Sequence, residues 1–221
     1  TDDSANLMEV TNNVIDVYFV PSDNVKPVIS FGNYNNHVVF SGETFRNNMT
    51  VTDNYGVQSV SIPQTSDIAV SKNNSNTEIT GTAPNVTSQT TKAVKVIATD
   101  KSNNQTEQSF NVLIKPLKDK YHVTSSSTIQ NPIRISSIRN GTTLTQTEKN
   151  TVINSLTITN NEPNRTYVTA PKNEIRSKEV SNVTNTNNNS SVTVTITYAD
   201  NTTSQINVLV KQIIPEIFAE P

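Results

Sequence analysis

A similar short segment recurs near the start, the middle and the end of this chain. It reads VIDVYFVP at 14–21, FNVLIKP at 110–116 and INVLVKQ at 206–212. Asp16, Asn111 and Asn207 hold the same position in the three copies, 95 (111 − 16) and 96 (207 − 111) residues apart. A fixed period of this size is typical of small domains in tandem. The sequence therefore predicts two complete modules cut from a longer array, each ending in one strand.

The repeat sets the expected domain boundaries. Residues 1–21 are the tail strand of a preceding domain, and residues 213–221 are a linker to the next one. Between them lie residues 22–117, called module 1, and residues 118–212, called module 2. Hydrophobic residues make up only 33% of the chain, yet the net charge is −2. Because disordered chains usually combine low apolar content with high net charge, we expect folded modules with thin cores.

Module 1 is expected to be a Greek-key β-sandwich of the cadherin or immunoglobulin type. Its apolar residues fall in short alternating runs separated by turn signals, with no helical period. The expected strands are Val28–Phe31, His37–Phe40, Phe45–Val51, Val57–Ile62, Ile68–Val70, Glu78–Gly81, Ala93–Ala98 and Phe110–Ile114.

Module 2 is expected to be a small α+β domain, with β-grasp as the favoured fold, so the whole chain is mostly β. Thr145 and Glu148 have the spacing of a capping box, which predicts a helix over about 145–155. A helix beside a mostly antiparallel sheet is an α+β arrangement. The Asn/Thr/Ser-rich run 183–190 is interpreted as a loop. The expected strands are Pro132–Ile135, Arg165–Val168, Glu174–Ser177, Val192–Tyr198 and Ile206–Lys211.

Composition argues against several classes of function. The chain has no cysteine, so it has no disulfide and no thiolate site. A pI near 5.7 with dispersed Lys and Arg argues against nucleic acid. His37 and His122 stand alone, and the five glycines form no phosphate loop. We therefore predict no enzymatic activity and interpret both histidines as structural. Asn111 and Asn207 could join lysines in isopeptide bonds, but outward-facing strand positions are the favoured interpretation.

Acidic loops in module 1 carry the sharpest functional signal. Asp23 precedes the first strand, Asp53 and Asn54 follow the third, and Asp100 and Asn104 lie in the final hairpin. In a Greek-key sandwich these three places meet at one pole. Crowded carboxylates are costly unless a cation joins them, and Ca²⁺ takes six to eight oxygens in irregular geometry. The sequence predicts a calcium site there; the alternative is that Asp-Asn pairs simply form turns.

The same segments resemble stalk modules of Gram-positive, and in particular staphylococcal, cell-wall adhesins. VTDNYGV at 51–57 and ATDKSNN at 98–104 look like cadherin-like modules, and VTVTITYADNTT at 192–203 resembles the final hairpin of β-grasp modules. The combination is similar to the serine-rich adhesins for platelets and related surface proteins. In that family cadherin-like modules are calcium-binding spacers, which implies ligand roles for Asp53, Asp100 and Asn104, and also for Asp23. The order here, cadherin-like before β-grasp, departs from that family.

The expected function is therefore a calcium-stiffened spacer of an extracellular, wall-anchored bacterial adhesin. Such a monomeric stalk would contact its neighbouring modules, while another domain bound the host ligand. No stretch of this sequence is apolar over the roughly 20 residues that a membrane span needs. The alternative is a module that binds a host matrix protein or glycan directly, and an accessory domain of a secreted hydrolase is a third class.

Overall fold

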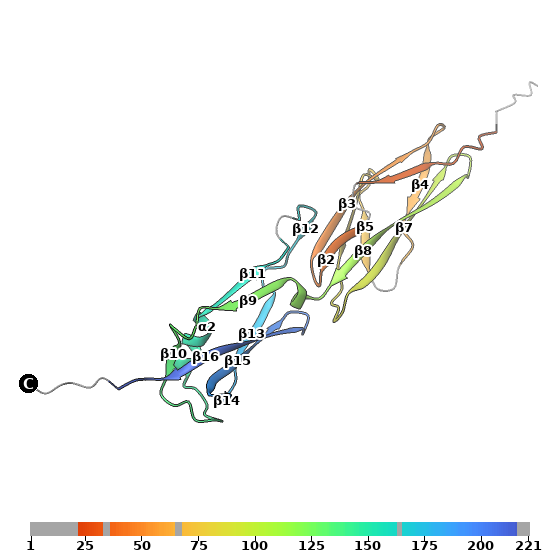
Figure 1. Ribbon diagram of the computed structural model, residues 1–221. Helices are drawn as coiled ribbons and strands as arrows, with labels where there is room; N and C mark the ends of the chain where they lie inside the picture. The colour runs from red at the N-terminus through yellow and green to blue at the C-terminus, as the bar shows by residue number, and fades with distance from the viewer. Residues whose placement is uncertain (1–21, 33–35, 65–67, 163–164, 216–221) are drawn as a thin grey trace, which may run out of the picture.

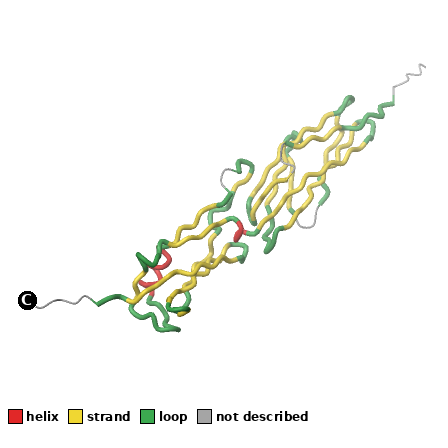
Figure 2. Tube along the Cα trace, in the orientation of Figure 1, coloured by secondary structure: helices red, strands yellow, loops and turns green. Residues whose placement is uncertain are grey.

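The computed structural model describes residues 22–32, 36–64, 68–162 and 165–215. It shows two elongated β-rich bodies placed end to end, with the described chain starting at one end of the long axis and finishing at the other (Figures 1 and 2). The first copy of the repeated segment, at 14–21, lies outside the described residues, as do residues 216–221.

Module 1 consists of two four-stranded sheets that face each other. One sheet has the order β1-β3-β6-β5 and the other β2-β8-β7-β4. All pairings within the module are antiparallel except that of β2 with β8, which is parallel. The prediction of a mostly β chain with a sandwich is confirmed. The strands are β1 (Val28–Phe31), β2 (Asn36–Phe40), β3 (Thr44–Thr52), β4 (Val57–Ser61), β5 (Ala69–Lys72), β6 (Glu78–Thr82), β7 (Thr90–Asp100) and β8 (Gln105–Lys115).

The core of module 1 is built by strict alternation. In β3, Phe45 and Met49 point inward while their neighbours are exposed, as expected for a strand with one buried face. Phe31 and Phe110 meet edge to face, with ring centroids 4.9 Å apart. Gly81 makes room for Phe45, because a Cβ on Gly81 would lie 2.6 Å from the ring's Cζ. The phenylalanine rings thus pack in a core whose other buried side chains are aliphatic, mostly Val and Ile.

Asn47 is an exception in this core, and it yields the first prediction. Its side chain faces inward with 1% exposure, and neither its amide nitrogen nor its oxygen has a hydrogen-bond partner. An unpaired buried amide costs roughly 1–3 kcal/mol. Replacing Asn47 by leucine, which has the same branched shape, is therefore expected to stabilise the chain by about that amount, seen as a higher urea midpoint with an unchanged slope. The exposed neighbour Asn48→Leu is the control, and an equal gain there would contradict the prediction.

Module 2 is organised around a mixed sheet with the order β10-β16-β15-β13, in which β10 runs parallel to β16 and β14 pairs with β15. Strands β9 and β11 form a separate antiparallel pair. The elements are η1 (Leu117–Asp119), β9 (Tyr121–Ser125), β10 (Ile133–Ile135), α2 (Gln146–Asn154), β11 (Leu156–Asn160), β12 (Val168–Thr169), β13 (Ile175–Val180), β14 (Thr184–Thr186), β15 (Asn189–Tyr198) and β16 (Thr203–Gln212).

The predicted helix is present and is capped as expected. Thr145 accepts a hydrogen bond from the backbone of Glu148, whose carboxylate accepts one from the Thr145 backbone in return. The helix buries Val152 completely against the module 2 core. The assignment of module 2 as a β-grasp stays a prediction.

Two sequence predictions about module 2 are wrong. The run 183–190 is not a loop: β14 and the start of β15 form a hairpin there, turned by Asn187 and Asn188 with φ of 48° and 68°. Asparagine tolerates this left-handed backbone, so two residues suffice for the turn. The strand expected at 165–168 begins only at Val168, because β12 pairs with β3 of module 1 rather than within module 2.

Candidate metal centre

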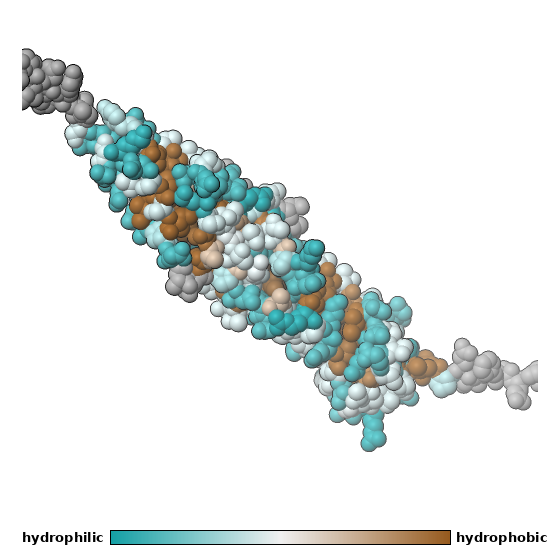
Figure 3. Space-filling model, turned by 180° about the vertical axis from the view of Figure 1, so that it is seen from behind, coloured by the Kyte–Doolittle hydropathy of each residue, from teal (hydrophilic) through white to brown (hydrophobic). Residues whose placement is uncertain are grey.

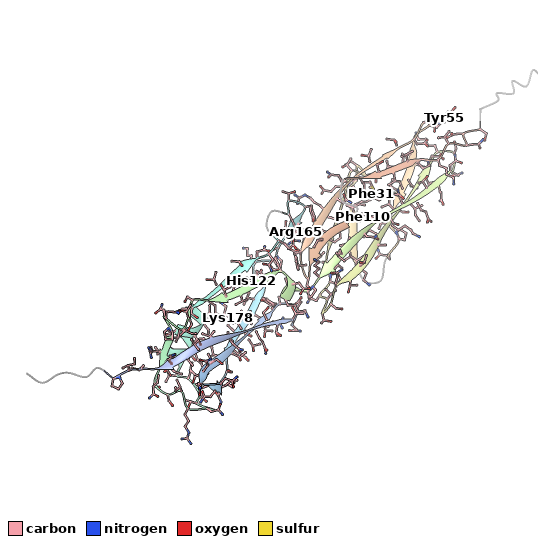
Figure 4. All side chains as sticks on the ribbon, viewed as in Figure 1. Phe31, Tyr55, Phe110, His122, Arg165 and Lys178 are labelled. Atoms are coloured by element: carbon pink, nitrogen blue, oxygen red, sulfur yellow. The ribbon has the colours of Figure 1, made fainter. Side chains whose placement is uncertain are left out.

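The acidic loops of module 1 meet at its N-terminal pole. Asp23 lies in the extended segment before β1, Asp53 between β3 and β4, and Asp100 at the β7–β8 turn. One carboxylate oxygen from each lies within 4.8 Å of the other two. Asp100 is fully buried, and Asp23 is 9% exposed. The neighbouring Tyr55, labelled in Figure 4, lies at the end of the molecule farthest from module 2.

Each carboxylate is held by its own loop. Asp53 Oδ2 accepts hydrogen bonds from the backbone of Tyr55 and Gly56, at 2.8 and 3.0 Å. Asp100 Oδ1 accepts from the backbone of Ser102 and Asn104, both at 2.8 Å. These are the local turns of the alternative interpretation. They use one oxygen of each of these two carboxylates. The second oxygen of Asp53 has no hydrogen-bond partner, whereas that of Asp100 accepts a hydrogen bond from the Asn104 side chain.

The remaining oxygens are what distinguishes this cluster from a set of turns. Asp23 Oδ2 and Asp53 Oδ1 are buried and have no hydrogen-bond partner. Within the described residues, no Lys or Arg nitrogen forms an ion pair with any of the three carboxylates. Burial acts to raise the pKa of Asp100, but hydrogen bonds from Asn104 and Ser102 outweigh it and hold this pKa below its usual value. A cation would balance this concentrated negative charge.

The two predicted asparagine ligands contact the cluster through nitrogen. Asn54 Nδ2 donates to Asp23 Oδ1 at 3.1 Å. Asn104 Nδ2 donates to Asp100 Oδ2 and to the Asp23 carbonyl, both at 2.9 Å. Both side chains therefore tie the segment before β1 to the loops. The oxygens facing one another come from the three aspartates.

Gly56 connects two of the loops that carry the aspartates. Its φ of 108° requires glycine, but its carbonyl accepts a hydrogen bond from the Lys101 backbone at 3.1 Å. The glycine thus fastens the Asp53 loop to the β7–β8 turn. The cluster is preorganised by bonds between loops as well as within them.

A second polar cluster, which the sequence analysis missed, lies between the modules. Glu43 of module 1 bonds both Nη atoms of Arg165, at 2.7 and 2.8 Å, and Lys120 Nζ at 3.1 Å. Lys120 Nζ also lies 2.5 Å from Glu174 Oε1, which accepts a hydrogen bond from the Tyr121 hydroxyl at 2.7 Å. The four charged side chains are at most 10% exposed, and we call them the joint cluster.

The other residues singled out in the sequence occupy strand positions. Asn111 is exposed on β8, and Asn207 on β16 accepts a hydrogen bond from Thr193 Oγ1 at 2.8 Å. His122 is exposed on β9. His37 lies in β2, where its side chain is outside the described structure. Among the helices within the described ranges, none is both long and apolar enough to cross a membrane.

The chain is similar in sequence to a known protein. No protein-family model matches the chain. The extracellular matrix-binding protein ebh of Staphylococcus aureus (strain MRSA252) is 56% identical over 209 residues, which is 95% of this chain but 2% of that protein. The chain thus spans a very small part of this relative's length.

Solved structures give weaker likenesses. The BIgI domain of beta protein from S. agalactiae, bound to CEACAM1, has a TM-score of 0.30 and 16% identity, covering 41% of this chain and 97% of that one. The cadherin domains EC1-4 of PcdhgB3 give a TM-score of 0.32 and 12% identity, covering 85% of this chain and 50% of that one. The two-sheet architecture of module 1 is defined by its own strand pairing. Over nearly its whole length, this chain is a homologue of a short segment of a staphylococcal extracellular matrix-binding protein.

Proposed function

We propose that this chain is a spacer of an extracellular bacterial adhesin, stiffened by Ca²⁺ at the N-terminal pole of module 1. The observation that carries the proposal is the trio of carboxylates with two buried, unpartnered oxygens. Ca²⁺ accepts carboxylates, backbone carbonyls and waters at irregular angles. It would supply the positive charge that Asp23, Asp53 and Asp100 lack.

The mechanism follows from where the cluster lies. Asp23 belongs to the segment that leads into module 1, whereas Asp53 and Asp100 belong to its folded body. A cation shared by all three would fix the direction in which the chain arrives. The rod shape, with its ends far apart (Figure 2), suits a part that holds another domain at a distance. Anchoring to the cell wall and binding of a host ligand would then belong to other parts of a longer protein.

Calorimetry of the whole chain tests the calcium site. Extracellular sites bind Ca²⁺ with Kd on the order of 10⁻⁴–10⁻³ M, so about 10 mM Ca²⁺ should stabilise the fold by roughly 1.4–2.7 kcal/mol relative to EDTA. We expect a higher Tm in Ca²⁺, and we expect Asp53→Asn and Asp100→Asn each to abolish that difference. Asp119→Asn, at an exposed position in η1, should retain it.

The calcium-dependent difference in Tm is the quantity to compare, because the aspartate variants also lose turn hydrogen bonds. If the wild-type Tm is equal in Ca²⁺ and in EDTA, the three loops bind no calcium and are ordinary turns. The spacer would then owe its stiffness to its protein contacts alone.

Direct binding of a matrix component is the second candidate. It is favoured by the name of the relative, an extracellular matrix-binding protein. On the face seen in Figure 3, however, hydrophobic residues form narrow bands separated by polar ones. Large exposed patches are the usual mark of a binding surface. The large hydrophobic side chains that are exposed among the described residues fall into separate groups. Val25, Val28 and Tyr55 lie in the N-terminal part of module 1, Ile129 lies in a loop of module 2, and Ile213 and Ile214 follow β16.

A further inference from the structure

The two modules exchange apolar side chains where they meet. Phe40, the last residue of β2 in module 1, is fully buried in the core cluster of module 2. In return, Val168 of module 2 packs against the core of module 1. Each core is therefore completed by a residue from the other module. An interface that contributes to both cores differs from the mostly polar contact that leaves domains free to move.

Strand β12 extends a sheet of module 1. Strand β1 pairs with β3 only between Met49 and Thr52, which leaves the first half of β3 without a neighbour on that side. β12 fills this place: Val168 pairs with Phe45 and Thr169 with Thr44. The Arg46 backbone donates to the Tyr167 carbonyl at 3.0 Å, and its guanidinium contacts Thr166 O. A strand of module 2 thus becomes part of a sheet of module 1.

The joint cluster spans the same boundary. Glu43 comes from module 1, while Lys120, Arg165 and Glu174 come from module 2. Two cations and two anions balance, and Lys120 and Arg165 also lie over the Phe40 ring, 5.9 and 4.8 Å from its centroid. Because a buried charge that loses its partner is strongly unfavourable, the cluster resists partial separation of the modules.

Hydrogen bonds also hold the backbone that links the modules, at Leu117 and Lys118. Asp200 Oδ2, in the β15–β16 turn, accepts a hydrogen bond from the Leu117 backbone at 2.7 Å. Thr202 Oγ1 accepts one from the Lys118 backbone at 3.1 Å. Asp200 and Leu117 are both buried. The residues that link the modules are therefore held against module 2 and do not form a flexible linker.

From these contacts we propose that modules 1 and 2 are a single cooperative unit whose joint is rigid without calcium. Four features join the modules at one boundary. Each core contains a residue of the other module, and β12 pairs with a strand of module 1. The joint cluster is buried and neutral, and hydrogen bonds hold the linking residues in place. The inference goes beyond the calcium site and does not rest on it, because that site lies at the opposite end of module 1 (Figure 4). Bending of the stalk is then confined to the N-terminal pole and to joints beyond this chain.

Hydrogen exchange of the whole chain in EDTA tests cooperativity. Val194→Ala perturbs only the module 2 core, where Val194 is fully buried. In one cooperative unit, the slowest amides of β7 and β8 in module 1 lose protection by the same factor as those of β15 and β16. The exposed Val28→Ala makes the same chemical change and should alter neither set. Loss of protection confined to module 2 would overturn the proposal.

Spin labels test rigidity separately. The chain has no cysteine, so Lys95→Cys in β7 and Lys178→Cys in β13 can be labelled alone, and both lysines are at the surface. We expect a narrow distance distribution between the labels that is the same in EDTA and in Ca²⁺. A broad distribution in EDTA would show a flexible joint and overturn the proposal. A failure of the calcium experiment would leave both of these results unchanged.

Discussion

Replacing Lys120 by methionine is expected to destabilise the chain by about 3–5 kcal/mol, although methionine keeps most of the apolar part of the side chain. Lys120 is only 3% exposed and lies between the carboxylates of Glu43 and Glu174. Glu43 keeps Arg165 as a partner, but Glu174 loses its only ion pair among the described residues. Its carboxylate already has one unpartnered buried oxygen, so it cannot remain charged there without a large cost.

Urea denaturation followed by circular dichroism measures this loss, and a double mutant shows its origin. Glu174→Gln removes the carboxylate that Lys120→Met leaves without an ion pair. The double mutant Lys120→Met/Glu174→Gln should therefore recover part of the stability that Lys120→Met alone loses. Lys118→Met, two residues earlier and exposed, is the matched control and should change stability little. A loss below about 1 kcal/mol for Lys120→Met would mean that the pair behaves like a surface ion pair.

Truncating Phe40 to alanine is expected to cost about 3–5 kcal/mol, the range for a buried phenylalanine. Phe40 has no exposed surface and lies among the residues of the module 2 core, including Leu117 and Tyr198. Its removal leaves a cavity there and also uncovers the cations of Lys120 and Arg165, which lie over its ring. A residue that belongs to module 1 by sequence should thus destabilise module 2.

Urea denaturation gives the size of the Phe40→Ala effect, and hydrogen exchange of β15 and β16 shows whether the loss of stability reaches module 2. Phe40→Leu keeps most of the apolar volume and should lose considerably less stability. If the alanine variant weakened protection only in module 1, Phe40 would not be part of the module 2 core in solution.

Much of the strand pattern could be predicted from the sequence because it depends on local signals. Alternation identified the long hairpins ending in 110–116 and 206–212, and the Thr145–Glu148 capping box located the helix. The convergence of Asp23, Asp53 and Asp100 followed from sandwich topology, since all three loops lie at one pole. Turn chemistry is harder to predict: the Asn/Thr/Ser-rich run 183–190 has the composition of a loop but contains a tight hairpin turn.

The joint between the modules could not be predicted, for a physical reason. Glu43, Lys120, Arg165 and Glu174 are far apart in the chain and follow no shared spacing. Each has the residue type of an exposed surface position, and only the meeting of two modules buries it. Strand β12 is equally hidden, because its partner lies more than a hundred residues away. Contacts between two modules leave no periodicity or motif in the sequence of either module from which they could be predicted.

The two parallel strand pairs have a consequence for how this chain carries tension. In module 1 an early strand, β2, runs parallel to the last strand, β8, and in module 2 β10 runs parallel to β16. Pulling on opposite ends of the rod draws the members of each pair in opposite directions along their own length. Their hydrogen bonds are then loaded in shear, all at once, instead of being peeled open one at a time. Each module therefore contains one parallel strand pair that would resist such a load in shear.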